Sequence, residues 1–366
     1  MSKHLIYFFA LRRGVILTGV VIGVLASLLQ YAGNPPNMGI CVAGFERDIA
    51  GALGFHREAA VQYIRPEIIG LVLGATLAAL IFREFKSRAT SASIVVFVLG
   101  AFTMIGALVF QGCPLRGLLR LAGADLNAIL GLGGFAVGVV IGVQFLKTGY
   151  TPGRSYKIPL ATGWILPIMM IGLLLLLIFQ PQFSDGGPIF FSQVGTGSMH
   201  AAVWFSLGAG LLIGFLGQRS RFCTMGAVRN VVLMGETTLL SGVGGLVAAA
   251  FLTNLLLGQV HPGFADQPVA QSQHVWNFLG MVLVGLASAL AGACPVRQLF
   301  LSGEGSGDAT IFVLGMTTGA IFAHNFAMVK PCVSGPMEVT VSPVGMAAVG
   351  LGLAVCLVLG FSMREN

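Results

Sequence analysis

Two cysteine motifs each occur twice in this chain, with the copies separated by half of its length. The first motif, Cys-x2-Gly-x2-Arg followed by Asp or Asn, begins at Cys41 and again at Cys223. The second motif, Cys-Pro followed by Leu or Val and then Arg, begins at Cys113 and again at Cys294. The copies are 182 and 181 residues apart in a chain of 366 residues. This spacing predicts an internal duplication of the whole chain, which constrains the architecture before any local pattern does.

The composition places both copies in a membrane. Hydrophobic residues make up 56% of the chain and charged residues only 9%, and the mean hydropathy is +0.90. Soluble domains are about 25% charged. We therefore expect an all-α polytopic membrane protein, with residues 1–180 as the first transmembrane repeat and residues 181–366 as the second. The apolar run from Gly14 to Leu29 lacks the cleavage site of a signal peptide, so we expect it to be the first transmembrane helix.

Hydropathy predicts ten membrane-spanning helices and four short segments between them. The ten spans are expected at 14–32, 66–82, 92–111, 126–146, 160–179, 198–217, 237–257, 276–293, 308–328 and 341–361. The four short segments are 41–54, 113–122, 223–234 and 294–301. Each is too short or too polar to cross a bilayer about 30 Å thick. Because each also follows a motif cysteine, we predict four re-entrant half-helices.

The distribution of lysine and arginine predicts the orientation. Basic residues are concentrated in the N-terminal arm and in loops 83–91, 147–159 and 218–236, whereas loops 180–197 and 258–275 contain none. We therefore expect a multi-pass protein of the cytoplasmic (inner) membrane with both termini in the cytoplasm. Each repeat then holds an odd number of spans, so the second repeat enters the membrane inverted. Inverted repeats are typical of transporters that bind their substrate near the midplane.

The motifs also indicate a binding site for an anion. Proline is favoured in the first turn of a helix, so Cys113 and Cys294 are expected at N-caps, where free N–H groups and the helix dipole attract negative charge. An arginine inside a span is costly and normally has a functional or paired role. The candidate substrate path therefore consists of Cys41, Cys113, Cys223, Cys294, Arg116, Arg297, Arg47 and Arg229.

Two of these arginines have alternative interpretations. Arg47 can equally pair with its neighbours Glu46 or Asp48, and Arg229 can follow the positive-inside bias of a cytoplasmic loop. His200 and His324 lie in predicted spans, where a histidine is either functional or a satisfied packing residue. The remaining cysteines, Cys332 and Cys356, lie outside both motifs, and Cys356 is expected to pack in the last span.

The thiols indicate the chemistry of the ligand. Sulfur is soft and polarizable, so it suits a soft sulfur or selenium anion, or a soft cation such as monovalent copper. The arginine in each motif disfavours the cation. A membrane thiol or persulfide relay enzyme is an alternative from another class, although the chain has no C-x2-C redox pair. We predict a non-enzyme with no catalytic residue, metal site, cofactor or nucleic-acid partner.

The two motifs resemble those of the YeeE/YedE sulfur-transport family, which includes thiosulfate-uptake proteins. The stretches 37–41, 62–70 and 218–223 are similar to the YedE subgroup, which is assigned to selenium transport. The resemblance implies a transporter or channel-like permease that takes up a small selenium- or sulfur-containing anion. It also implies that the four motif cysteines handle the substrate by S–H···S contacts in a narrow constriction. Expected partners are this anion, the lipid bilayer and, as a further candidate, a cytoplasmic selenium- or sulfur-handling acceptor protein.

Overall fold

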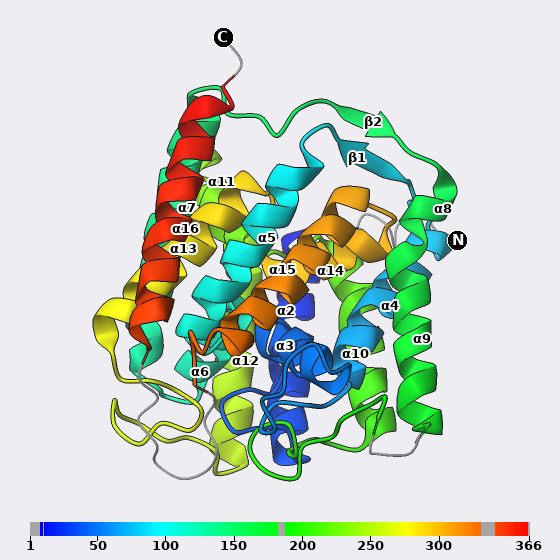
Figure 1. The fold of residues 1–366 in the computed structure, drawn as a ribbon, viewed down its shortest axis with the longest axis vertical. Helices are drawn as coiled ribbons and strands as arrows, with labels where there is room; N and C mark the ends of the chain where they lie inside the picture. The colour runs from blue at the N-terminus through cyan, green and yellow to red at the C-terminus, as the bar shows by residue number, and fades with distance from the viewer. Residues whose placement is uncertain (1–7, 10, 182–186, 331–340, 365–366) are drawn as a thin grey trace.

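The computed structural model describes residues 8, 9, 11–181, 187–330 and 341–364, and these fold mainly as helices (Figure 1). The long helices are α2 (Arg12–Tyr31), α4 (Pro66–Ile81), α5 (Ser93–Val109), α7 (Asn127–Lys147), α9 (Ile165–Phe179), α10 (Val203–Ser220), α12 (Thr238–Leu256), α13 (His274–Leu290), α15 (Gly307–Asn325) and α16 (Pro343–Ser362). The short helices are α3 (Val42–Ala52), α6 (Pro114–Ala122), α11 (Thr224–Met234) and α14 (Pro295–Gly303). A single turn, α8 (Leu160–Gly163), precedes α9, and the strands β1 (Arg88–Thr90) and β2 (Ser155–Lys157) pair antiparallel.

These helices follow the sequence prediction closely. Each of the ten predicted spans overlaps one long helix, and each of the four predicted short segments overlaps one short helix. The starts shift most, by five residues, in α9, which the turn α8 precedes, and in α10, which begins at Val203 rather than at 198. The residues before it are held in a loop by contacts with the segment that precedes α4. For example, Gly197 N–H donates to the Ala60 carbonyl, and the Arg65 side chain donates to the Met199 carbonyl.

Within the described residues, six helical segments are long and apolar enough to cross a membrane. These segments are α2, α7, α12, α16 and the stretches Ser93–Ala122 and His274–Gly303, each of which joins a long helix to a short one. The helices α4 and α9 are apolar but shorter. The chain is therefore a multi-pass membrane protein, while passage of all ten long helices through the bilayer remains a prediction.

Four pairs of helices join the two halves of the chain. The pairs are α2 with α12, α4 with α10, α5 with α15, and α7 with α13. Glycines bring the two backbones into contact: a Cβ atom added at Gly19 would overlap the Gly242 carbonyl, and one added at Gly138 would overlap the Val282 carbonyl. Small residues allow this close approach in membranes, where no hydrophobic force drives helices together.

The same contacts give the direction of each pair. In α2 and α12, Gly19 meets Gly242 and Gly23 meets Leu246, so residue numbers rise together and the two helices are parallel. The glycine contacts of the other three pairs follow the same rule. When the ten long helices are counted in chain order, with α2 as the first and α16 as the tenth, each pair joins two odd-numbered or two even-numbered helices. This is the arrangement expected if successive long helices alternate in direction across a membrane.

The helix pairs also occur in matched sets. The correspondence between the repeats, given by the cysteine motifs and by chain order, matches α2, α4, α5 and α7 with α10, α12, α13 and α15. It therefore converts the pair α2–α12 into α10–α4, and the pair α5–α15 into α13–α7, all of which are present. Similarly, α3 packs on α15 as α11 packs on α7. The last matched helices, α9 and α16, break this pattern: α9 packs on α4, α16 packs on α13, and they lie at opposite edges of Figure 1.

The loops separate to the two ends of the helices. The loops that follow α3, α9 and α12 gather at the lower end of Figure 1, and β1 and β2 lie at the upper end. The register of the strands, Arg88 with Lys157 and Thr90 with Ser155, joins the two basic loops that the sequence predicts on one side of the membrane. The packing thus agrees with the predicted orientation of these loops relative to each other.

Candidate functional site

The four motif cysteines form two pairs, and each pair lies where two short helices begin. Cys41 is the N-cap of α3, and its thiol neighbours that of Cys113, the N-cap of α6. Cys223 is the N-cap of α11, and its Sγ lies 3.4 Å from the Sγ of Cys294, the N-cap of α14. We call Cys41 and Cys113 the first thiol pair, and Cys223 and Cys294 the second thiol pair. All four cysteines are buried.

The two cysteines of each pair cap their helices differently. The sulfur of Cys41 accepts a hydrogen bond from Gly44 N–H at 3.3 Å, and that of Cys223 accepts one from Gly226 N–H at 3.2 Å. Sulfur thus takes the place of the oxygen acceptor usual at an N-cap. Cys113 and Cys294 precede a proline in the first turn and form no such bond. Their N-cap position agrees with the prediction from the Cys-Pro motif.

This arrangement gives each thiol pair a positive electrostatic environment. The first N–H groups of a helix have no partner within the helix, and the helix dipole adds partial positive charge at the same end. Two such ends meet at each thiol pair, since α3 and α6 begin at the first and α11 and α14 begin at the second. A small anion that reaches either pair would therefore meet weak S–H donors and backbone dipoles of favourable sign.

The arginines of the Cys-Pro motifs have different partners. Arg116 is buried and donates to the backbone carbonyls of Asn37, Gln111 and Val269, with no carboxylate among its hydrogen-bond partners in the described residues. Arg297 instead pairs with Glu304, with 2.9 Å between nitrogen and oxygen. At these matched positions, therefore, neutral backbone oxygens hold the guanidinium of Arg116, whereas a carboxylate holds the guanidinium of Arg297.

The arginines of the first motif show the opposite assignment. Arg47 pairs with the carboxylate of Asp48 at 2.7 Å, so the local pairing considered from the sequence is the arrangement present. Arg229, at the matched position, contacts the neutral amide oxygen of Asn230 at 3.3 and 3.4 Å. Among the described residues of each half, therefore, one motif arginine meets a carboxylate and the other meets neutral oxygens. The assignment is exchanged between the halves.

A buried ion network beside the first thiol pair was not singled out by the sequence analysis. Asp48 also pairs with Arg65 at 2.7 Å, and Arg65 donates further to the carbonyl of Thr196. The aspartate of the first motif was the available signal: Arg47 binds only its Oδ1 atom, which leaves Oδ2 to Arg65. A second buried pair joins Arg120 and Asp125 at 2.7 Å.

The two candidate histidines each lie against another aromatic ring. His324 in α15 lies 4.6 Å from His56, centroid to centroid, and no hydrogen-bond partner for either of its ring nitrogens is found in the described residues. His200 stacks on Tyr63 at 4.3 Å with the rings nearly parallel. Both contacts join the segment between α3 and α4 to the second half of the chain. Neither histidine belongs to a thiol pair.

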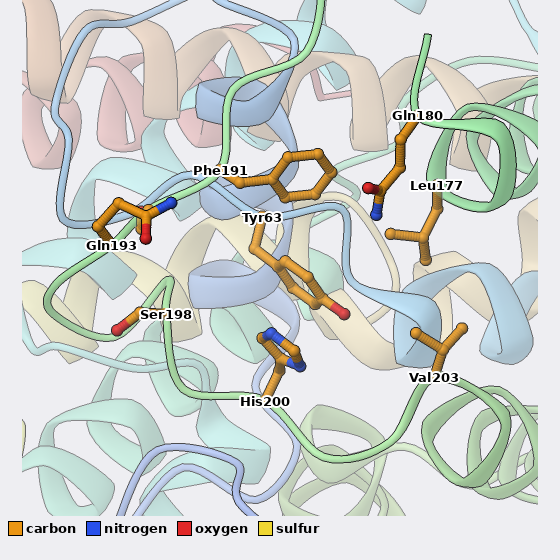
Figure 2. A pocket seen from close by; sticks show the side chains of 9 residues that line it. Tyr63, Leu177, Gln180, Phe191, Gln193, Ser198, His200 and Val203 are labelled. Atoms are coloured by element: carbon orange, nitrogen blue, oxygen red, sulfur yellow. The ribbon is translucent and has the colours of Figure 1, made fainter. Parts of the chain in front are cut away.

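His200 and Tyr63 also line a cavity of about 600 Å³ at the lower end of the helices (Figure 2). Its other lining residues are Leu177, Gln180, Phe191, Ser192, Gln193, Ser198 and Val203. Figure 2 shows that these side chains come from the segment before α4, the end of α9 and the segment leading into α10. The lining is neutral and partly polar, and it contains none of the eight residues predicted for the substrate path.

The remaining cysteines do not belong to either thiol pair. Cys356 is buried in α16, as expected for a packing residue, and Cys332 lies outside the described residues. The part of the chain that the structure describes contains no group of three histidine, cysteine or acidic side chains that could hold a metal ion. The chemistry of the thiol pairs therefore rests on sulfur, backbone N–H groups and guanidinium groups.

Two comparisons with known proteins each found a match to part of the chain. Residues 219–364 match a family described as "Sulphur transport". A stretch of 118 residues is 30% identical to the thiosulfate transporter TsuA of Spirochaeta thermophila. That match covers 32% of this chain and 35% of the length of the relative.

Proposed function

We propose that this protein is a membrane transporter or channel-like permease for a small sulfur-containing anion, with thiosulfate as the leading candidate. The observation that carries the proposal is the pair of buried thiols at each meeting point of two helix N-termini. The similarity to a sulphur-transport family and to a thiosulfate transporter supports the same class of substrate. Selenium anions share the softness of these ligands, and the resemblance to the YedE subgroup makes them the second substrate to test.

The proposed path crosses the membrane past both thiol pairs. We propose ten spans, four re-entrant half-helices and two inverted repeats in the cytoplasmic membrane, with both termini in the cytoplasm. The parallel helix pairs and their matched sets support this arrangement. The first thiol pair then faces the outer side and the second faces the cytoplasm. The cavity at Tyr63 and His200 lies at the outer end of the path.

The path offsets the cost of taking an anion out of water in three ways. Helix N-termini present partial positive charge, thiols offer weak S–H donors, and buried arginines supply full positive charge. Buried Arg116 and half-buried Arg229 suit the last role, because their hydrogen-bond partners in the described residues are neutral oxygens and not carboxylates. A cytoplasmic acceptor that consumes the anion would complete its uptake.

Uptake by cysteine variants tests the proposal. Each motif cysteine is replaced by alanine, and uptake of labelled thiosulfate and labelled selenite is measured in cells that lack other transporters for these anions. Cys356→Ala is the matched control, since Cys356 is equally buried but lies outside both pairs. We expect loss of uptake in the motif variants alone. Undiminished uptake in all four would overturn the proposal. Competition by sulfite, selenite and selenide would rank the substrates.

The thiol relay is retained as an alternative function because two sulfurs of the second pair lie 3.4 Å apart. In this reaction a cysteine thiolate attacks the outer sulfur of thiosulfate, forming a persulfide and releasing sulfite. The attacking sulfur forms the new S–S bond as the S–S bond of thiosulfate breaks, and total charge is conserved. Mass spectrometry of protein incubated with thiosulfate separates the two functions. A persulfide formed at the rate of uptake favours the relay, and unmodified cysteines favour the permease.

A further inference from the structure

Glu46 is a buried acid that the proposed path does not use. It lies in the second turn of α3, the short helix that Cys41 caps, and its side chain is 3% exposed. Neither carboxyl oxygen has a hydrogen-bond partner in the described residues. An ionised carboxylate without a partner is very costly in a protein interior, and more so within a membrane. Glu46 therefore carries a proton in this state of the protein.

The charged groups around α3 are already engaged. On α3 itself, Arg47 pairs with Asp48, and Arg65 from the following loop pairs with the same carboxylate. The helices packed against α3 are α4, α5, α14 and α15. Of their charged and titratable groups, Glu67 accepts from Asn34 and Asp308 accepts from Thr90. Arg297 pairs with Glu304, the residue that follows α14, and His324 lies against the ring of His56. Residues of α5 carry no charge. Within the described residues, α3 and these four helices therefore offer no free cation to pair with an ionised Glu46.

The second repeat shows that a carboxylate is not needed to pack this position. The shift that superposes Cys41 on Cys223 superposes Glu46 on Val228, which packs against the apolar core. Both short helices begin at a capping cysteine and have the same length. An apolar residue thus fits the equivalent site, and the acid at Glu46 adds a proton-binding group beside one thiol pair only.

We propose that Glu46 couples anion uptake to proton uptake, an inference that rests on the proposed function. An anion at the first thiol pair and a negative charge on Glu46 repel each other, so the anion binds better when Glu46 holds its proton. By linkage, the anion strengthens proton binding by the same factor. The proton is taken from the outer solution, accompanies the anion and is released to the cytoplasm when the path admits water from that side.

Purified protein in liposomes tests this coupling. The membrane potential is clamped with potassium and valinomycin, and entry of labelled thiosulfate is measured with equal pH on both sides and with the outside made acidic. We expect the acidic outside to accelerate entry several-fold in the wild type. Glu46→Gln removes the proton site with little change of shape, so we expect it to retain thiosulfate exchange but lose the acceleration.

Two further variants make the result specific. Glu67→Gln changes another buried acid, which accepts a hydrogen bond from Asn34, and we expect it to keep the acceleration. Glu46→Val copies the residue of the second repeat and replaces Glu46→Gln as the test if the latter does not elute as a folded protein. Absence of any thiosulfate exchange by the wild type would overturn the proposed function and this inference together. Exchange without acceleration, or acceleration that survives in the Glu46 variant, would overturn the proton coupling alone.

Discussion

The sulfur atoms of Cys223 and Cys294 lie 3.4 Å apart, although the two residues are separated by 71 positions in the chain. A disulfide bond requires about 2.05 Å between the sulfurs, so a small side-chain movement would join them. We expect mild oxidation to form this disulfide, to block uptake, and to be reversed by a reductant. Peptide mapping by mass spectrometry would identify the linked pair. Oxidation that leaves both thiols free would show that the sulfurs are not close in the working protein.

Two glycines of α7 provide a matched test of the helix packing. A Cβ atom at Gly138 would overlap the Val282 carbonyl of α13, whereas one at Gly133 would meet no atom within 4 Å. We expect Gly138→Ala to lower the stability by about 1–3 kcal/mol, because the two backbones must separate. Gly133→Ala should leave the stability unchanged or raise it by up to about 1 kcal/mol through helix propensity. Thermal unfolding in detergent measures both, and equal midpoints would contradict the parallel α7–α13 contact.

Asp48 holds two arginines together, so its neutral analogue should be strongly destabilising. In Asp48→Asn the buried guanidinium groups of Arg47 and Arg65 lose their shared carboxylate. Removing one partner of a buried ion pair costs about 3–5 kcal/mol. We expect a large fall in the unfolding temperature, with Asp266→Asn, in an exposed loop, as the unaffected control. If both variants unfold together, the ion network does not stabilise the fold.

Labelling of single exposed cysteines can determine the orientation. Val194 and Tyr156 are 52% and 51% exposed and lie at the two ends of the helices. The native cysteines of the thiol pairs are buried and should react slowly. In intact cells, a membrane-impermeant maleimide should label Val194→Cys, and it should label Tyr156→Cys only after the membrane is opened. The reverse pattern would place the N-terminus outside and exchange the sides of the two thiol pairs.

The sequence predicts those features that depend on local signals. Proline after Cys113 and Cys294 predicts two helix starts, and hydropathy predicts the approximate place of each long helix. The partners of the charged residues were less accessible, because they come from distant segments. Arg116, for example, donates to Val269, and Arg65 donates to Thr196. No local pattern reveals such contacts. The pairing of Arg47 with Asp48 joins adjacent residues and was accordingly one of the two interpretations considered.

The cross-half helix contacts were beyond prediction for a related reason. Glycines at positions such as Gly19 and Gly138 indicate close packing, but many glycines in an apolar chain could serve. Only the folded structure selects the helix that each one touches. The matching of α2–α12 with α10–α4 follows from these choices and could not be read from the motifs.

The backbone contacts between the halves have a mechanical consequence. Every one of the four parallel pairs takes one helix from each half, so the halves are interleaved and share their tightest interfaces. A rocking motion of one half against the other would have to break all four at once. We therefore expect opening of the proposed path to fall to the short helices and their capping cysteines. In that arrangement the long helices would act as a fixed frame, and the moving parts would be no larger than α3, α6, α11 and α14.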